Sequence, residues 1–274
     1  MTYQARSITT LYQCAFIVFM ALLTSTAVLA APSNDEWQHE RREWNLALPE
    51  SGQVAVNNVW GDVRVRTHLK DEVYVLANIQ HHQQDPRTMD LVINNESNHE
   101  LGLTAHFTDN QKTNNPADWA PRRIDLTVFV PASQALSITT TKGLAEVRGL
   151  SAPLSVRTQT GNVLLRIKNT LDLYSDYGDV QVFFLNTQWQ KASRVETKAS
   201  DIEVIIPKGG NTEVGIETHG QITTDFSINI QRDESESYKT ASASIGKDGS
   251  KLSIKSDRGA VRLLSSVVPD ASAQ

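Results

Sequence analysis

One repeated pattern constrains the fold of this chain more than any other feature. Residues 154–165 read Leu-x-Val-x-Thr-x-x-Gly-x-Val-x-Leu, with apolar residues at alternate positions on both sides of a short polar turn. Six such copies contain 24 positions at which the pattern requires an apolar residue, and 23 of these positions hold one. A hydrophobic content of 39% would fill about 9 of them by chance. The copies are centred on Gly61, Gly143, Gly161, Gly178, Ser200 and Gly259, and a copy shifted by one residue is centred on Gly220.

Alternation with a period of two predicts two half-buried strands in each copy, because successive side chains of a strand point to opposite faces. From position 143 onward the turn positions are separated by 18, 17, 22, 20 and 39 residues. A period near 20 is typical of stacked units, each too small to bury its own apolar face. The turn glycines and Ser200 are therefore predicted to be structural turn positions.

Two arrangements fit the strand pattern. In a β-solenoid the turn is a corner and successive copies pair in parallel, whereas in a β-sandwich the turn closes an antiparallel hairpin. A small polar residue stands three positions before the turn residue in every copy, which favours a stacked column that binds corner backbone groups. Hairpin signals such as Asn-Gly are missing from these turns. We predict an all-β, single-domain β-solenoid with rungs of roughly 17–22 residues and two short strands per rung.

The segments around the repeat are assigned as follows. Residues 1–30 are expected to be a signal peptide, because Arg6 precedes an apolar run at 14–23 and Val-Leu-Ala follows at 28–30. An uncleaved anchor is the alternative. Residues 31–50 are expected to cap the domain at 51–264, and residues 265–274 to be a disordered tail.

Two departures interrupt the pattern. Residues 80–123 are predicted to be an antiparallel insertion near the N-terminal half, with a hairpin formed by 91–93 and 101–107. Residues 231–250 are rich in Ser, Asp, Glu, Lys and Gly, which predicts a mobile loop.

The composition excludes several classes of function. Residues 31–274 contain no cysteine, so disulfides and a cysteine nucleophile are excluded there. The whole chain carries a formal net charge of −5. A mildly acidic surface argues against nucleic acid and against unaided binding to an anionic membrane.

No chemical motif emerges from the remaining residues. His81 and His82 near Asp85 lack the ligand number and spacing of a zinc site. Carboxylates follow the turn residue at 62, 179 and 201, where calcium binding competes with the ordinary preference of Asp for turns. The outward positions three past the turn residue show no catalytic pair. We therefore predict no catalytic, metal or cofactor site.

Several motifs in the frame are shared with a known family. Val-Phe-Val-Pro-Ala at 128–132 precedes the copy at 136–143, and Gly-Asn-Val and Gly-Asp-Val follow at 161–163 and 178–180. Asn-Val-Trp-Gly-Asp-Val at 58–63 is similar to an opening copy. Over about residues 50–264 the chain resembles the putative adhesin domain family of bacterial envelope proteins. The resemblance implies a β-solenoid without established catalytic residues.

The sequence thus favours an exported, non-enzymatic repeat protein of the periplasm or cell envelope, with an extracellular location as the alternative. Its surface would serve adhesion or bind an envelope protein or glycan. A carbohydrate-active enzyme on a β-helix scaffold and a structural component of the envelope are the competing hypotheses.

Overall fold

The computed structural model describes residues 37–266 except positions 51, 83–88, 98, 109–121 and 233–237. From Trp37 onward the chain forms one compact unit. The predicted signal peptide and most of the predicted tail lie outside the described residues. No helix in the described part of the chain is long and apolar enough to cross a membrane.

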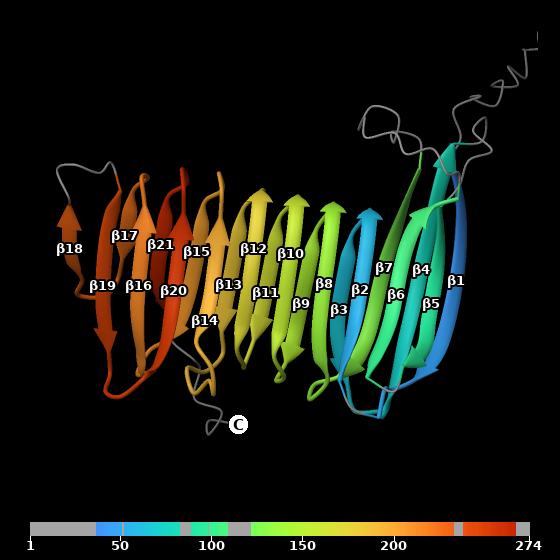
Figure 1. Cartoon of the computed structure of the whole chain (residues 1–274), viewed down its shortest axis with the longest axis horizontal. Coiled ribbons are helices and arrows are strands. Elements are labelled where there is room, and N and C mark those ends of the chain that lie inside the picture. The colour runs from blue at the N-terminus through green and yellow to red at the C-terminus, as the bar shows by residue number, and fades with distance from the viewer. Residues whose placement is uncertain are drawn as a thin grey trace, which may run out of the picture. The chain divides into compact units, whose positions relative to one another are not determined.

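The fold is all-β, as predicted, and its described strands form two large mixed sheets (Figure 1). In sheet order, the ten-stranded sheet contains β1 (Trp37–Ala47), β4 (Glu72–His82), β7 (Arg122–Pro131), β3 (Val63–His68), β9 (Ala145–Leu150), β11 (Val163–Ile167), β13 (Val180–Phe184), β15 (Ile202–Pro207), β21 (Val261–Ser266) and β17 (Ile222–Thr224). The eleven-stranded sheet contains β18 (Asn229–Arg232), β19 (Lys239–Ile245), β16 (Thr212–Thr218), β20 (Ser250–Ser256), β14 (Ser193–Thr197), β12 (Leu171–Tyr177), β10 (Leu154–Thr160), β8 (Ala135–Lys142), β2 (Gln53–Trp60), β6 (Glu100–Phe107) and β5 (Met89–Ser97).

Each repeat copy contributes one strand to each sheet. The strands on either side of Gly161, β10 and β11, belong to different sheets and do not pair with each other. Equivalent residues of successive copies pair in parallel, so that Leu154 lies opposite Leu136 and Leu171. The turn is therefore a corner between sheets, and the hairpin alternative is excluded for these copies.

The core lies between the two sheets. The inward residues of the repeat frame line it, and Val156, Val163, Leu173 and Val182 are 0–1% exposed. Their outward neighbours are polar or charged in most copies, which is the alternation that the sequence shows.

The corner residues stack in a column, and this packing requires glycine. A Cβ on Gly161 would lie 2.0 Å from the carbonyl oxygen of Gly143, and one on Gly143 would lie 2.1 Å from that of Gly61. Both glycines also have φ near +140°, which L side chains rarely adopt. Ser200 does not have a positive φ, so its turn accepts a side chain.

Several of the small polar residues before the turns form hydrogen bonds at the corners, whereas Ser175 Oγ in the middle of the stack is buried without a hydrogen-bond partner among the described residues. Thr140 Oγ1 donates to Thr158 Oγ1 at 3.0 Å. Thr197 Oγ1 and Ser256 Oγ both donate to the carbonyl oxygen of Ser200, at 3.0 and 2.9 Å. Buried hydroxyls thus satisfy corner carbonyls that water cannot reach.

The N-terminal departure differs in part from its prediction. The hairpin is present, since β5 and β6 pair antiparallel. However, β6 and β7 also pair in parallel with β2 and β3, so they extend the stack as a further pair of strands and are not a separate antiparallel layer. On the other side of β7, β4 and β1 add antiparallel strands to the edge of the ten-stranded sheet. The sequence pattern missed this pair because 14 residues, 108–121, separate the two strands in the chain in place of a short glycine-containing turn.

Part of the segment 231–250, which was predicted to be a mobile loop, forms a strand, while positions 233–237 lie outside the described residues. Within this segment, β19 pairs antiparallel with β16, because residues 241–244 read Ala-Ser-Ala-Ser and bury both alanines. The chain order of the copies is also broken. The last pair of strands, β20 and β21, inserts between β14 and β16 in one sheet and between β15 and β17 in the other.

Candidate functional site

The outer face of the ten-stranded sheet carries two rows of side chains that run across the strands. The parallel register places equivalent positions of successive copies side by side. The positions three past the turn residue form one row: Arg64, Glu146, Leu164, Gln181, Glu203 and Arg262. The positions five past the turn residue form the second row: Arg66, Arg148, Arg166, Phe183, Ile205 and Leu264.

A single buried carboxylate organises the basic end of this face. Glu146 is 4% exposed and contacts three guanidinium groups. Its carboxylate oxygens lie 3.7 Å from Arg64, 2.9 Å from Arg66 and 2.5 Å from Arg148. Burial raises the pKa of Glu146, but the hydrogen bond and charge of Arg66 and the charge of Arg148 outweigh it and hold the pKa below its usual range. Glu146 is therefore ionised at neutral pH.

Arg166 is the next arginine in the row, and it differs from the others. It lies directly opposite Arg148 on one side and Phe183 on the other. It is exposed, and among the described residues it has no ion pair or side-chain hydrogen bond. A hollow of about 260 Å³ is lined by Arg148, Leu164, Arg166, Gln181 and Phe183.

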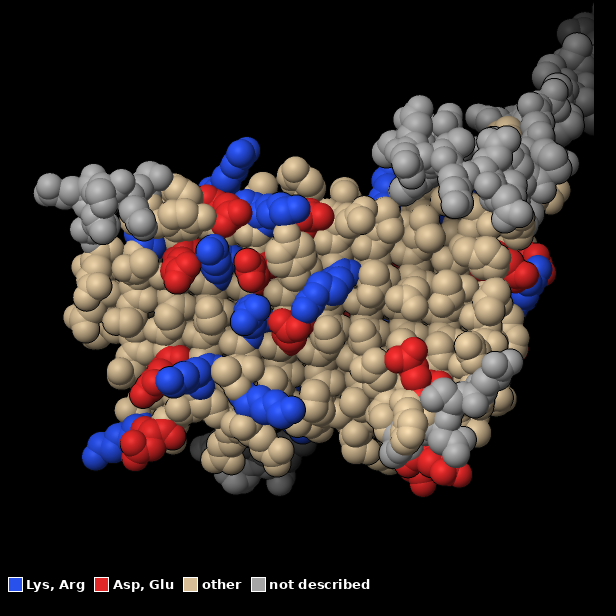
Figure 2. Space-filling view, in the orientation of Figure 1, with Lys and Arg blue, Asp and Glu red and all other residues tan. Residues whose placement is uncertain are grey.

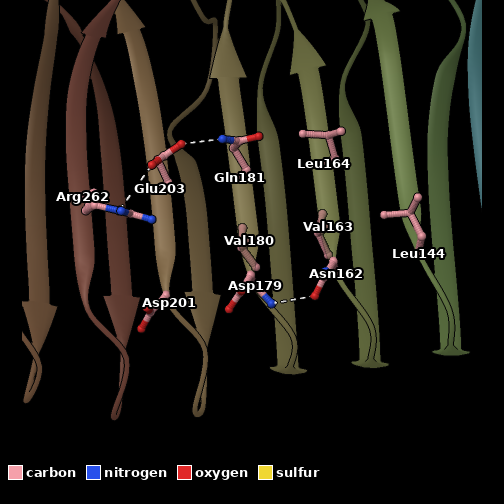
Figure 3. Close-up of a pocket in the computed structure, with 10 residues that line it drawn as sticks. All are labelled: Leu144, Asn162, Val163, Leu164, Asp179, Val180, Gln181, Asp201, Glu203 and Arg262. Carbon is pink, nitrogen blue, oxygen red and sulfur yellow. Dashed lines mark hydrogen bonds and ion pairs between the residues drawn. The ribbon is translucent and has the colours of Figure 1, made fainter.

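A second hollow of about 360 Å³ adjoins the first and shares Leu164 and Gln181 with it. Figure 3 shows its floor, where Gln181 donates to Glu203 and Arg262 Nε lies 3.3 Å from the same carboxylate. This end is acidic, because Asp179, Asp201 and Glu203 outnumber the one arginine in its lining. The two hollows together form a shallow groove across β9, β11, β13, β15 and β21.

Two of the three turn carboxylates considered as calcium ligands, those of Asp62 and Asp201, accept backbone N–H groups of the neighbouring copy. Asp62 Oδ1 accepts the Leu144 backbone N–H at 3.1 Å, and Asp201 Oδ1 accepts that of Ala260 at 2.8 Å. Asn162 Oδ1 accepts the N–H of Asp179 in the same way, at 3.1 Å. These side chains tie each turn to the next copy. Within the described ranges no group of three or more His, Cys, Asp or Glu is placed to hold a metal ion.

The histidines considered for zinc lie at the end of β4. His81 contacts the carbonyl oxygen of His82 at 3.2 Å through Nδ1. The His82 ring packs edge-on against Trp37, with centroids 6.3 Å apart. Asp85 lies outside the described residues. Trp37 is on β1, and the more buried Trp44 of the same strand packs against the core.

The outer face of the eleven-stranded sheet is also polar but electrically mixed. Figure 2 shows positive and negative side chains gathered over β10, β12, β14 and β20 on this face, with few over β2 and β8. Most charges there are paired, as in Lys198 with Asp176 at 2.5 Å and Lys255 with Glu217 at 3.5 Å. This face therefore presents no concentrated charge of one sign.

Sequence reasoning missed the three arginines of the second row, Arg66, Arg148 and Arg166, because it considered only the positions three past the turn residue. The signal was present two residues further on, where three of the first four copies in the frame carry arginine. What the sequence alone did not supply was the adjacency of β3 and β9, whose arginines are 82 residues apart in the chain.

No protein family model and no curated protein matches this chain. Among solved structures, a putative cell adhesion protein from Clostridium sporogenes is similar over 84% of this chain and 100% of its own, with 10% identity and a TM-score of 0.44. A putative adhesin from Bacteroides fragilis is similar over 84% of this chain and 97% of its own, with 10% identity and a TM-score of 0.43.

Proposed function

We propose that this chain is an exported, non-enzymatic binding protein of the cell envelope. In this proposal the stacked copies form a β-solenoid with rungs of roughly 17–22 residues, and the outer face of the ten-stranded sheet binds a glycan or an envelope protein. The observation that carries the proposal is the shallow groove on this face, in which side chains from five strands of the parallel stack are placed in two continuous rows.

The use of the carboxylates favours binding over catalysis. Hydrolysis of a glycosidic bond generally requires two carboxyl groups on either side of the scissile bond, one of them with a raised pKa. Here the pKa of Glu146 is lowered by its arginines, and Glu203 is engaged by Gln181 and Arg262. Asp62 and Asp201 hold neighbouring copies together.

The proposal is tested with the purified chain on a panel of immobilised glycans and by crosslinking to isolated envelope proteins. Leu164 lies where the two hollows meet, so Leu164→Glu is expected to weaken binding about tenfold or more by placing a charge in the groove. Thr139→Glu, at an exposed position of the opposite sheet, is the control and is expected to leave binding unchanged.

Two results would count against the proposal. Release of new sugar reducing ends during incubation would support the carbohydrate-active enzyme. Binding that is insensitive to Leu164→Glu and sensitive to Thr139→Glu would move the binding surface to the other sheet.

A further inference from the structure

Three arginines lie side by side on neighbouring strands at the basic end of the groove. Arg66 on β3 is directly opposite Arg148 on β9, which is directly opposite Arg166 on β11. Neighbouring strands are about 4.8 Å apart, and like charges placed directly opposite each other destabilise a sheet. We call these three residues the arginine row.

Only part of this repulsion is relieved within the described protein. Glu146 neutralises one of the charges and holds Arg66 and Arg148. Arg66 is further tied by donating to the carbonyl oxygen of Val65 at 3.0 Å. Arg166 has no such partner, and the Arg148 side chain is 55% exposed. The row therefore offers the Arg166 guanidinium, which has no anionic partner among the described residues, beside the Arg148 guanidinium, which is paired with Glu146 and still partly exposed.

The surroundings of the row supply flat apolar surfaces. Phe183 lies directly opposite Arg166, and Phe129 lies directly opposite Arg66 at the other end. Both aromatic side chains are partly exposed on the outer face. A ligand lying across these strands would meet aromatic, guanidinium and again aromatic side chains in turn.

The extent of the positive charge limits the shape of the ligand. Beyond Phe183 the groove becomes acidic at Asp179, Asp201 and Glu203, and the whole chain has a net charge of −5. A broad plane of phosphates, such as a membrane surface, would meet these carboxylates as well as the arginines. A narrow chain that carries single negative charges and flat sugar rings can place its charges on the row alone.

We propose that the arginine row, with Phe183, binds the carboxylates of an acidic polysaccharide that lies across β3, β9, β11 and β13. The guanidinium fork of Arg166 donates two N–H groups to one carboxylate, and Arg148 contributes to the same or the neighbouring one. The aromatic rings support the apolar faces of the sugars. This inference rests on the proposed function and specifies the ligand of its groove.

The experiment measures the affinity of the full chain for polygalacturonate, whose sugars each carry a carboxylate, with dextran as the uncharged polymer. Arg166→Gln is expected to weaken binding of polygalacturonate about tenfold or more, and Arg166→Lys, which keeps the charge without the fork, by less. Arg194→Gln is the matched control. Arg194 is exposed on the opposite sheet with no ion pair among described residues, so this variant loses the same charge and is expected to change affinity less than about twofold.

Each remaining outcome decides against the inference in a different way. If Arg166→Gln and Arg194→Gln lowered the affinity for polygalacturonate equally, the binding would be due to general charge attraction and not to a site at Arg166. If the chain bound dextran with an affinity that Arg166→Gln did not change, glycan binding would remain the function but the ligand would not be an acidic polysaccharide. Binding to anionic phosphatidylglycerol vesicles, with none to polygalacturonate, would assign the row to a lipid surface. Failure to bind either polymer or the vesicles overturns the inference, while the crosslinking test of the proposed function still stands on its own.

Discussion

At the scale of single residues, the corners of the stack are the positions least open to change. Each turn glycine packs its Cα against a carbonyl oxygen of the neighbouring copy, and the approach leaves no room for a side chain. At several corners, buried polar side chains then satisfy backbone carbonyls that this close packing removes from water. A glycine corner therefore requires the absence of a side chain at the turn, and in several copies a buried polar side chain also donates to a corner carbonyl.

Gly161→Ala tests the close packing. A Cβ there would lie 2.0 Å from the Gly143 carbonyl oxygen at a φ of +140°, so we expect a loss of about 2–4 kcal/mol in the free energy of unfolding. Gly215→Ala is the control, because a Cβ on Gly215 meets nothing within 4 Å. Urea denaturation measures both. A Gly161→Ala protein as stable as the control would disprove the required approach.

Glu146 links stability to pH. Because the pKa of Glu146 is lowered in the folded protein, its contribution is present above its unfolded pKa, near 4.3, and is lost as the pH falls through the folded value. Glu146→Gln should therefore cost about 1–3 kcal/mol at pH 7, and the difference from wild type should shrink in acid. Glu213→Gln, at an exposed site, serves as the control in the same pH series. A difference that grows in acid would contradict the assignment.

At the scale of elements, antiparallel strands form three of the four edges of the two described sheets. At one end of the stack β1, β4 and β5 cover the outermost parallel strands. At the other end β18 and β19 cover β16 in the eleven-stranded sheet, whereas the short parallel strand β17 forms the edge of the ten-stranded sheet. The edge strands β17 and β18 are only three and four residues long, and short edge strands limit pairing with other molecules, a hazard of any long open sheet. The polar strand β19 can pair in the sheet because small apolar residues, Ala241 and Ala243, occupy its inward positions.

The alternation in β19 is testable with neighbouring residues. Ala243→Asp buries a charge opposite Val214 and is expected to cost about 2–4 kcal/mol, whereas Ser242→Asp, one position away and exposed, should cost less than about 0.5 kcal/mol. Thermal unfolding compares the two variants. Equal stability would mean that this segment is the mobile loop expected from its composition.

At the scale of the whole molecule, stability is distributed along a stack in which each copy contacts only its neighbours. The central copies, such as β10–β13, are paired in parallel on both sides in both sheets. The outermost strands have a partner on one side only. In such arrays stability is approximately a sum of local terms, so opening from the ends is favoured.

Hydrogen exchange measured by mass spectrometry should show this gradient. We expect the amides of β10–β13 to exchange most slowly, and those of β1, β5, β17 and β18 to exchange fastest. The difference should widen in low concentrations of urea, because end copies open before the centre. Uniform exchange in all strands, with a single opening event, would contradict local stability and indicate an all-or-none domain.

Much of the fold was predictable from the sequence because its information is local and repeated. The alternation around Gly161 defines strand, turn and inward face within twelve residues, and the same rule applied to five other turns. The candidate site was harder to predict. Asp62 and Asp201 appeared as separate turn residues, and their shared role in joining neighbouring copies depends on the register between strands.

The sequence by itself determined the all-β class, the buried face of each repeat strand and the glycines at the corners, since these follow from side-chain periodicity and backbone sterics within one copy. Only the tertiary structure decided which copies are neighbours, because pairing between strands is non-local. That pairing inserts β20 and β21 before the copy of Gly220, adds β6 and β7 to the stack, and places Arg66 beside Arg148. The arginine row therefore exists as a surface only once the sheet has assembled.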